Sequence, residues 1–364
     1  MQALTTSPAP PSASAAEPRF DKIYILADDL TGACDSAASF LATGLSVRVW
    51  LGPTATQGVA EPVQAFNTAS RGLDTAAAAG AVSEAALAIS GHPRTLWFKK
   101  VDSAGRGQIG AEVLAAHRAL GTRAVLFAPS FPAAGRTVRE GILHVEDSAG
   151  NSTHIPLLIQ FQQFAPTILI SNVAQVVATI AASNSVLICD AVTQQDLEDF
   201  AAIDAPGILY AGSAGLAKAL AKTSFTHSAI FSTELPRAAR PMTFSGSLHG
   251  VTHLQMQHLA DRLPSHPAIQ IPVEVEDQPA ILHHFETFDP DALILTGGDT
   301  ALLVLQTLGA DSILLCGEVA DGIPWGLVQG GLAHGRIVVT KSGGFGTAES
   351  LTRIVHQLTG EISA

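Results

Sequence analysis

The sequence predicts an α/β protein of two domains, each a mostly parallel sheet flanked by helices. Short β-branched runs alternate with Ala- and Leu-rich helical stretches along almost the whole chain, which is typical of βαβ units. The chain has 364 residues, of which 47% are hydrophobic and 14% charged, so it can build two packed α/β cores.

The expected strands form two series. The first comprises the β-branched runs at 22–27, 45–50, 95–100, 123–128, 186–190 and 207–211. The second comprises those at 241–244, 268–273, 292–296, 312–316 and 336–340. Between them, residues 221–240 lack periodicity and predict a linker with a boundary near Pro236. We therefore predict a loose tail at 1–20, an N-terminal domain at 21–235 and a C-terminal domain at 241–364.

Composition excludes several classes of protein. A formal charge of -12 disfavours binding to nucleic acid or to an anionic membrane surface. No apolar run is long enough to cross a bilayer, and the Ala/Ser/Pro-rich start resembles neither a secretory signal nor a transit peptide. Three separated cysteines, Cys34, Cys189 and Cys316, indicate buried reduced thiols and a cytoplasmic location. An anionic substrate would then need a local basic cluster.

Glycine- and serine-rich turns in the second domain predict a nucleotide site. Each follows a strand and precedes a helix: Ser245-Gly246-Ser247, Gly297-Gly298-Asp299-Thr300 and Gly343-Gly344-Phe345-Gly346. Glycine permits close approach of the backbone to a ligand, and the amides of a helix start suit phosphate oxygens. Any one turn could be an ordinary connection capped by Asp299 or Thr300, but three together favour a nucleotide.

The same region lacks the motif of a P-loop enzyme. No GxxxxGK[ST] segment occurs in the chain. Lys341, directly before the last turn, is expected to be solvated, with a phosphate contact as the alternative.

Two adjacent carboxylates follow the first expected strand. Asp28 and Asp29 precede a predicted helix, and at a strand's carboxyl end such a pair can grip a hydroxyl, accept its proton or hold Mg²⁺. The alternative is that Asp29 caps the helix and Asp28 makes a loop hydrogen bond.

A basic cluster follows the strand at 95–100. Lys99, Lys100 and Arg106 lie beside Asp102 and supply the positive patch that an anionic substrate needs, although a solvated basic face is the alternative. The segment also spells Gly105-x-Gly107-x-x-Gly110, a weak dinucleotide fingerprint because the next strand does not end in an acid. Downstream, Arg136 lies in a Gly/Pro-bent loop of the kind that carries function.

The thirteen histidines predict no metal site. His249 and His253 have the i,i+4 spacing of metal ligands, but no acid accompanies them. No GxSxG segment supports a serine hydrolase.

Taken together, these segments resemble the four-carbon acid sugar kinase family. The resemblance runs in family order from about residue 23 to residue 351. It rests on 27–33, 99–103, 106–107, 110–112, 128–136, 212–216, 245–247, 296–301, 317–319, 322–324 and 340–346. One departure is Asp102-Ser103-Ala104-Gly105-Arg106-Gly107, where members of this family usually read Asp-Ser-Thr-Leu-Arg-Gly.

The resemblance implies a kinase whose active site lies in the cleft between a sugar-acid domain and an ATP domain. It implies transfer of phosphate from ATP, with Mg²⁺, to the terminal hydroxyl of threonate, erythronate or an oxo-derivative. The implied nucleotide contacts are Ser247, Gly297, Gly298, Asp299, Thr300, Gly343 and Gly344. The implied substrate side comprises Asp28, Asp29, Lys100, Asp102, Arg106 and Arg136, with Asp28 or Asp29 as the base.

Two other functions stay open at this point. One is an NAD-dependent dehydrogenase that uses the Gly105 turn, and the other is a sensor that binds a sugar acid or nucleotide without transferring phosphate. The expected partner is a small sugar acid rather than nucleic acid or membrane, and a homo-oligomer is compatible with each function.

Overall fold

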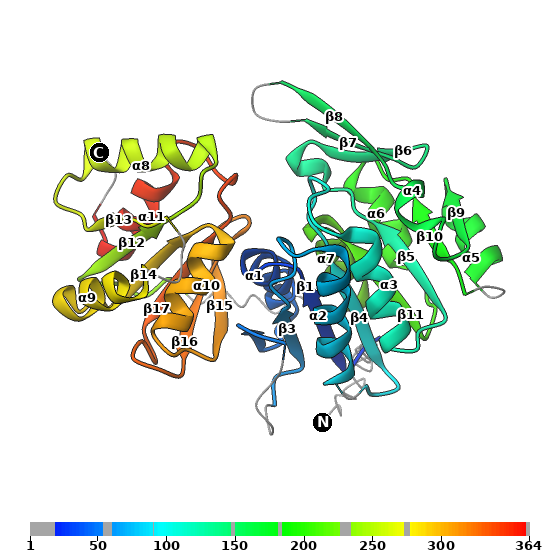
Figure 1. Cartoon of the computed structure of the whole chain (residues 1–364), viewed down its shortest axis with the longest axis horizontal. Coiled ribbons are helices and arrows are strands. Elements are labelled where there is room, and N and C mark those ends of the chain that lie inside the picture. Colours follow the sequence, from blue (N-terminus) through cyan, green and yellow to red (C-terminus); the bar gives the residue numbers. More distant parts are fainter. Residues whose placement is uncertain are drawn as a thin grey trace, which may run out of the picture.

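The computed structural model describes residues 19–53, 60–89, 91–146, 150–180, 184–225, 234–272 and 277–361. Most of the predicted tail, the middle of the predicted linker and the end of the strand predicted at 268–273 lie outside these residues. The described chain forms an α/β structure around one large, mostly parallel sheet (Figure 1). Among the described helices, none is both long enough and apolar enough to span a membrane.

The N-terminal half supplies eight strands of this sheet, in the order β2-β3-β1-β4-β11-β5-β10-β9, all parallel to their neighbours. Their bounds are β1 Lys22–Ala27, β2 Val47–Trp50, β3 Val63–Asn67, β4 Thr95–Lys100, β5 Ala124–Ala128, β9 Thr167–Ile170, β10 Val186–Cys189 and β11 Ile208–Gly212. The helices are α1 Leu30–Ala38, α2 Thr75–Leu87, α3 Ile109–Ala119, α4 Leu158–Phe161, α5 Val173–Ile180, α6 Gln194–Ala201 and α7 Ala214–Ser224, with short 3₁₀ turns η1 Leu41–Thr43 and η2 Pro132–Ala134.

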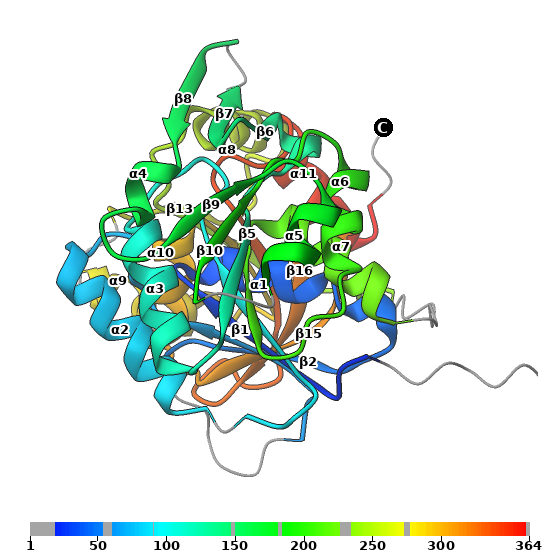
Figure 2. The same ribbon diagram turned by 90° about the vertical axis from the view of Figure 1, so that its right-hand side faces the viewer.

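A separate antiparallel sheet projects from this half. It consists of β6 Arg136–Arg139, β7 Ile142–Glu146 and β8 Ser152–Pro156. Figure 2 shows β7 and β8 rising from the body of the molecule. Its base packs on the loop after β4, because a Cβ built on Gly105 would lie 2.4 Å from Ile155 Cδ1.

The C-terminal half continues the large sheet in the order β13-β12-β14-β17-β16-β15. The strands are β12 Pro241–Ser245, β13 Ala268–Gln270, β14 Ala292–Thr296, β15 Ser312–Ala320, β16 Ile323–Gln329 and β17 Ile337–Lys341. The helices are α8 Gly250–Arg262, α9 Gln278–Phe288, α10 Gly298–Thr307 and α11 Ser350–Thr359. The strands β12, β14 and β17 are parallel neighbours, so their carboxyl ends meet at one edge.

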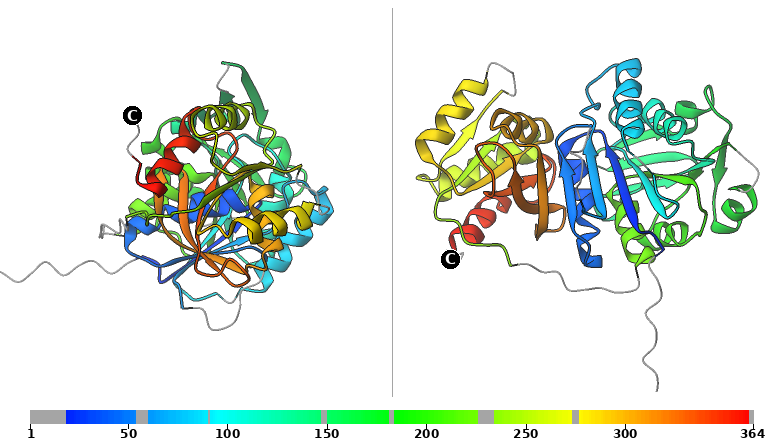
Figure 3. Two further views of the ribbon diagram at one scale, coloured as in Figure 1. Left: turned by 90° about the vertical axis from the view of Figure 1, so that its left-hand side faces the viewer. Right: turned by 90° about the horizontal axis from the view of Figure 1, so that it is seen from below.

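The two halves meet through an antiparallel pair. Residues of β15 pair with β2, which joins both series of strands into a 14-stranded sheet. Viewed from below, β1, β2 and β3 lie next to the C-terminal half (Figure 3). The sequence predicted a sheet in each domain, and the structure adds that the two are continuous.

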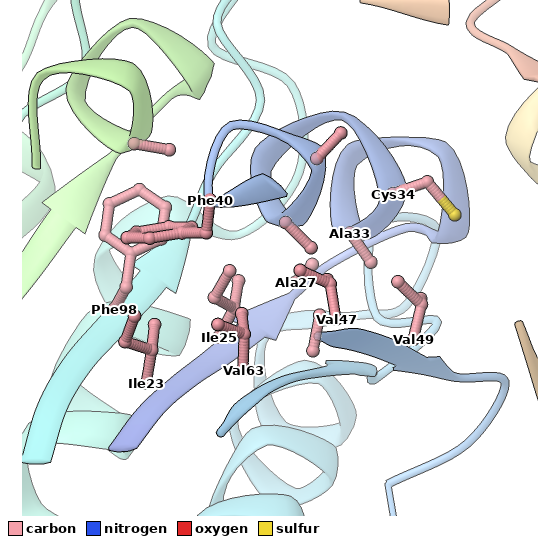
Figure 4. Packing of buried hydrophobic residues seen from close by; sticks show 14 of the residues in the cluster. Ile23, Ile25, Ala27, Ala33, Cys34, Phe40, Val47, Val49, Val63 and Phe98 are labelled. Carbon is pink, nitrogen blue, oxygen red and sulfur yellow. The ribbon is translucent and has the colours of Figure 1, made fainter. Parts of the chain in front are cut away.

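Helix α1 lies at the centre of the molecule and is buried along its whole length. Figure 4 shows side chains of β1, β2 and β3 directed toward it, among them Ile25, Ala27 and Val49. The hydrophobic cluster beneath α1 includes residues of both halves, and separate clusters lie under α2 and α3 and under α8 and α11. The central helix is therefore held by both halves, and its N-terminus lies at the strand edge that carries the predicted site.

Candidate active site between the two halves

The end of β1 places Asp28 and Asp29 side by side with an arginine that the sequence did not single out. Arg71 follows β3, the neighbour of β1, and its Nε and Nη2 donate to the two carboxylate oxygens of Asp28 at 2.7 and 3.0 Å. Arg71 Nη2 also donates to Asp29 Oδ1 at 2.7 Å. Burial alone would raise the pKa of Asp28, but Arg71 and Lys99 outweigh it and lower that pKa.

Asp29 has a different environment from Asp28. It is the N-cap of α1: its Oδ1 accepts from the Gly32 amide at 3.0 Å, and its Oδ2 accepts from Thr31 Oγ1 at 2.8 Å. The structure thus bears out the cap at Asp29 that the sequence offered as one alternative, and a catalytic role of this carboxylate stays a prediction.

The loop after β4 brings Asp102 and Arg106 to the same place. Arg106 donates through Nε and Nη2 to the two oxygens of Asp102, at 3.0 and 2.7 Å, and Arg71 Nη2 lies 3.7 Å from Asp102 Oδ1. Burial raises the pKa of Asp102, but the two guanidinium groups hold it well below its usual range. The result is an alternating cluster of carboxylates and guanidinium groups.

The two lysines of β4 take different positions. Lys99 is fully buried in an ion pair with Glu112 of α3, Nζ to Oε2 2.7 Å, so it belongs to the core and not to an accessible patch. Lys100 Nζ donates to the Val101 carbonyl and would lie 3.0 Å from a Cβ built on Gly32. Lys100 therefore reaches the first turn of α1, beside Asp29.

Arg136 begins β6, and its Nε is buried without a hydrogen-bond partner among the described residues. Burial lowers the pKa of Arg136, whereas Asp102 raises it, so the guanidinium interacts electrostatically with the same cluster. An unsatisfied buried donor of this kind suits a ligand carboxylate.

The glycine turns of the C-terminal half converge. A Cβ built on Gly343 would lie 2.2 Å from Ser247 Oγ, and one on Gly297 would lie 3.3 Å from Ser247 Cβ. Thr300 Oγ1 accepts from the Gly246 amide at 2.9 Å and ties the first turn to α10. Ser247 Oγ accepts from the His249 amide and lies 3.1 Å from Thr252 Oγ1, which donates to the Gly343 carbonyl at 2.7 Å.

The remaining predicted nucleotide residues occupy the edges of this group. Gly298 and Asp299 form the first turn of α10, where Asp299 is exposed, and Gly344 lies next to the ring of His249. Gly297 needs its glycine, because its φ is 102°.

Lys341 is not solvated as expected but fully buried. Its Nζ donates to the carbonyls of Ser342, Gly343 and Phe345 at 2.9, 3.4 and 3.2 Å, so it supports the last glycine turn from within. Burial lowers its pKa to about 7, because the charged form is taken out of water.

The two sets of residues face each other. A Cβ built on Gly298 would lie 2.6 Å from Asp29 Oδ2 and 3.3 Å from Thr31 Oγ1, so the starts of α10 and α1 almost touch. Nearby, the rings of Phe131 and Phe345 have centroids 6.3 Å apart across the junction. The carboxylate cluster and the glycine turns thus lie next to each other at the junction of the two halves.

The turn that carries the weak dinucleotide fingerprint packs on the protein itself. A Cβ on Gly110 would lie 2.2 Å from the Gln160 carbonyl oxygen, and Gly105 is covered by Ile155. These glycines accommodate the protein's own backbone and side chains, which disfavours a dinucleotide at this turn.

Comparisons with known proteins agree with this division of the site. Residues 23–158 and 161–220 match the model of a sugar-binding N-terminal domain, and residues 279–351 match that of a nucleotide-binding C-terminal domain. The chain is 32% identical to a D-threonate kinase from Bordetella bronchiseptica, with 92% of this chain and 97% of that protein covered. It is 28% identical to a 3-oxo-tetronate kinase from Salmonella typhimurium over 67% of this chain and 65% of that protein.

A solved structure shares the fold. A crystal structure of another Salmonella typhimurium protein superposes with a TM-score of 0.70 at 21% identity, covering 93% of this chain and all of that one. The two domain models and the D-threonate kinase relative together show that the chain belongs to the four-carbon acid sugar kinase family.

Proposed function

We propose that the protein transfers the terminal phosphate of ATP to the terminal hydroxyl of a four-carbon sugar acid, threonate, erythronate or an oxo-derivative. The observation that carries this proposal is the meeting of Asp29 Oδ2 with Gly298 at the start of α10. A carboxylate that can accept a hydroxyl proton thereby lies against a turn suited to phosphate. The relatives' names supply the class of substrate.

The substrate's carboxylate is assigned to the basic side of the cluster. Arg136 has an unpartnered buried Nε among the described residues, and Arg106 presents its guanidinium beside Asp102. Arginine suits bidentate recognition of a carboxylate, and Lys100 adds positive charge at the start of α1. In this proposal, the acid end of the substrate would bind away from the glycine turns, with its far hydroxyl toward Asp29.

Asp29 is the proposed base. Both oxygens of Asp28 accept from Arg71. Asp29 Oδ2 accepts from the neutral Thr31 hydroxyl and lies beside the Gly298 position, whereas Asp29 Oδ1 is the oxygen that meets Arg71. Asp29 would accept the hydroxyl proton as the phosphorus–oxygen bond forms, and ADP would leave with the electrons of the broken bond.

The turns fit a triphosphate. The Ser247 hydroxyl, which can rotate from Thr252 to a ligand, and the free amides at the start of α10 would be donors for phosphate oxygens. Gly297, Gly298, Gly343 and Gly344 keep the surface free of side chains. Mg²⁺, carried with the triphosphate, would neutralise its charge, and the exposed Asp299 is the carboxylate placed to hold it. Asp28 is not available for this because Arg71 occupies both of its oxygens.

The experiment is a panel assay. The purified protein is mixed with ATP, Mg²⁺ and each stereoisomer of threonate and erythronate and their 3-oxo forms, and ADP release is followed. We expect ADP release that depends on one or a few of these acids, with ³¹P NMR placing the phosphate on the terminal hydroxyl. The soluble substrates also fit the cytoplasmic location that we propose.

The non-catalytic sensor remains the competing function, and the same assay separates the two. Binding of ATP and of a tetronate without ADP release would establish the sensor and end the kinase proposal. Reduction of NAD⁺ by any of the acids would instead point to a dehydrogenase.

A further inference from the structure

The histidine before α8 lies among the nucleotide turns. His249 is the N-cap of α8, and its Nδ1 accepts a hydrogen bond from the Val251 amide at 3.2 Å. Its own amide donates to Ser247 Oγ at 3.3 Å. The side chain is exposed, although its helix-capping contact fixes how the ring is turned.

The capping contact also fixes which ring nitrogen carries the proton. In a neutral imidazole, the nitrogen that accepts a hydrogen bond cannot carry hydrogen, so acceptance at Nδ1 places the hydrogen of His249 on Nε2. His249 therefore presents one N–H donor at the far edge of its ring.

That donor points at the last glycine turn. A Cβ built on Gly344 would lie 3.1 Å from His249 Nε2, closer than to any other atom of the ring. Gly344 belongs to the segment that matches the nucleotide-binding model, and on its other side Gly343 lies against Ser247. The Nε2 hydrogen of His249 and the Ser247 hydroxyl thus lie beside the same glycine turn.

We propose that His249 binds a phosphate group of the nucleotide, with Nε2–H donating to a phosphate oxygen. This inference rests on the proposed function and adds a residue to its nucleotide site. The sequence offered His249 only as half of an i,i+4 metal pair with His253. Among the described residues, no group of three His, Cys, Asp or Glu side chains could hold a metal ion.

The test is the substitution His249→Asn. Asparagine is a favoured N-cap and keeps an acceptor for the Val251 amide, but it lacks a donor that reaches Gly344. We expect the Kd of ATP and of ADP, measured by calorimetry, to rise about tenfold or more, because a hydrogen bond to a charged acceptor is lost. The Tm without nucleotide should stay unchanged, since the cap is kept.

The control is His253→Asn, on the exposed side of the next turn of the same helix, which should leave both Kd values unchanged. In a long-range ¹H–¹⁵N spectrum, the Nε2 signal of His249 should move when ATP is added. An ATP affinity equal to that of the unmodified protein would overturn the role of His249 alone. Absence of ATP binding by the unmodified protein would overturn the proposed function and this inference with it.

Discussion

At the scale of single residues, two neighbouring aspartates have separate tasks. Asp28 holds Arg71 in place through two hydrogen bonds, and Asp29 offers Oδ2 to the opposite half. We expect Asp29→Asn to lower kcat by about 10²–10⁴, because Asn keeps the cap of α1 but cannot take a proton, and to lower the Tm as well, because the ion pair with Arg71 is lost. Steady-state kinetics with ATP and the preferred acid measure this.

Asp74→Asn is the matched control, since Asp74 caps α2 at an exposed position, where its Oδ1 accepts from the amides of Ala76 and Ala77. It should leave kcat unchanged. Asp28→Asn should chiefly raise KM and lower Tm, because it frees Arg71. An Asp29→Asn enzyme with full kcat would show that another group takes the proton.

The site residues that were predicted from the sequence lie beside glycines or in short clusters of acidic and basic residues. Arg71 was missed because β3, which leads to it, was not predicted. The strand reads Val-Gln-Ala-Phe-Asn and is buried on both faces, so its polar residues break the apolar run without producing an alternation. Gln64 and Asn67 are accommodated by hydrogen bonds from Trp50 and to the Leu51 carbonyl, which only the fold reveals.

At the scale of elements, the last glycine turn is hydrogen-bonded to the buried amino group of Lys341. Lys341 has three N–H donors and meets three carbonyls of the turn that follows it. Lys341→Met keeps the length and apolar stem but leaves those carbonyls without their donor. We expect the turn to move, with a rise of at least tenfold in the Kd of ATP and a Tm lowered by several degrees.

Calorimetry and thermal unfolding would measure both effects. Lys222→Met is the control, because Lys222 lies largely exposed at the end of α7 and pairs only with Glu198. Unchanged ATP affinity in Lys341→Met would show that the turn holds its shape without the lysine.

Regular elements were predictable where apolar runs were long, as in β1, β4 and β14. The small sheet was not, because β8 is almost wholly exposed and β6 carries two arginines. The Ala104-Gly105 departure from the family motif finds a partial explanation here. Ile155 of β8 fills the space in front of Gly105, so the smaller residue makes room for the small sheet.

At the scale of the whole molecule, the junction between the halves lies beyond what a local pattern can reveal. The pairing of β2 with β15 joins residues more than 250 positions apart, and each strand alone reads as an ordinary apolar run. Helix α1 reads as a small-residue helix, yet it is covered by strands and helices of both halves. The prediction that the site lies between the halves therefore rested on the resemblance to the family and not on the periodicity of the sequence.

One carboxyl group is buried at this junction with incomplete hydrogen bonding. Asp35 of α1 is 6% exposed, and its Oδ1 has no hydrogen-bond partner among the described residues. A Cβ on Gly322, in the turn between β15 and β16, would lie 3.5 Å from that oxygen. The charged groups that act on it are Lys100, Lys218, Glu318 and Asp321.

Burial raises the pKa of Asp35 to about 7, with the two lysines opposing and the two acids adding to the rise. Because the folded-state pKa exceeds the unfolded one, the protonated group favours the folded state at low pH. This contribution is lost as the pH rises through about 7. The free energy of unfolding should therefore fall as the pH rises from about 4, the usual pKa of an aspartate, to about 7.

The substitution Asp35→Asn should remove this pH dependence. At about 1.4 kcal/mol for each pKa unit, the stability of the unmodified protein relative to the variant should fall by on the order of 3 kcal/mol between pH 5 and pH 8. Urea unfolding at a series of pH values measures the difference. Asp261→Asn, at an exposed position of α8 and not among the charged groups that act on Asp35, should give a curve parallel to that of the unmodified protein. A parallel curve for Asp35→Asn as well would mean that Asp35 does not titrate in this range, and that the junction is insensitive to its charge.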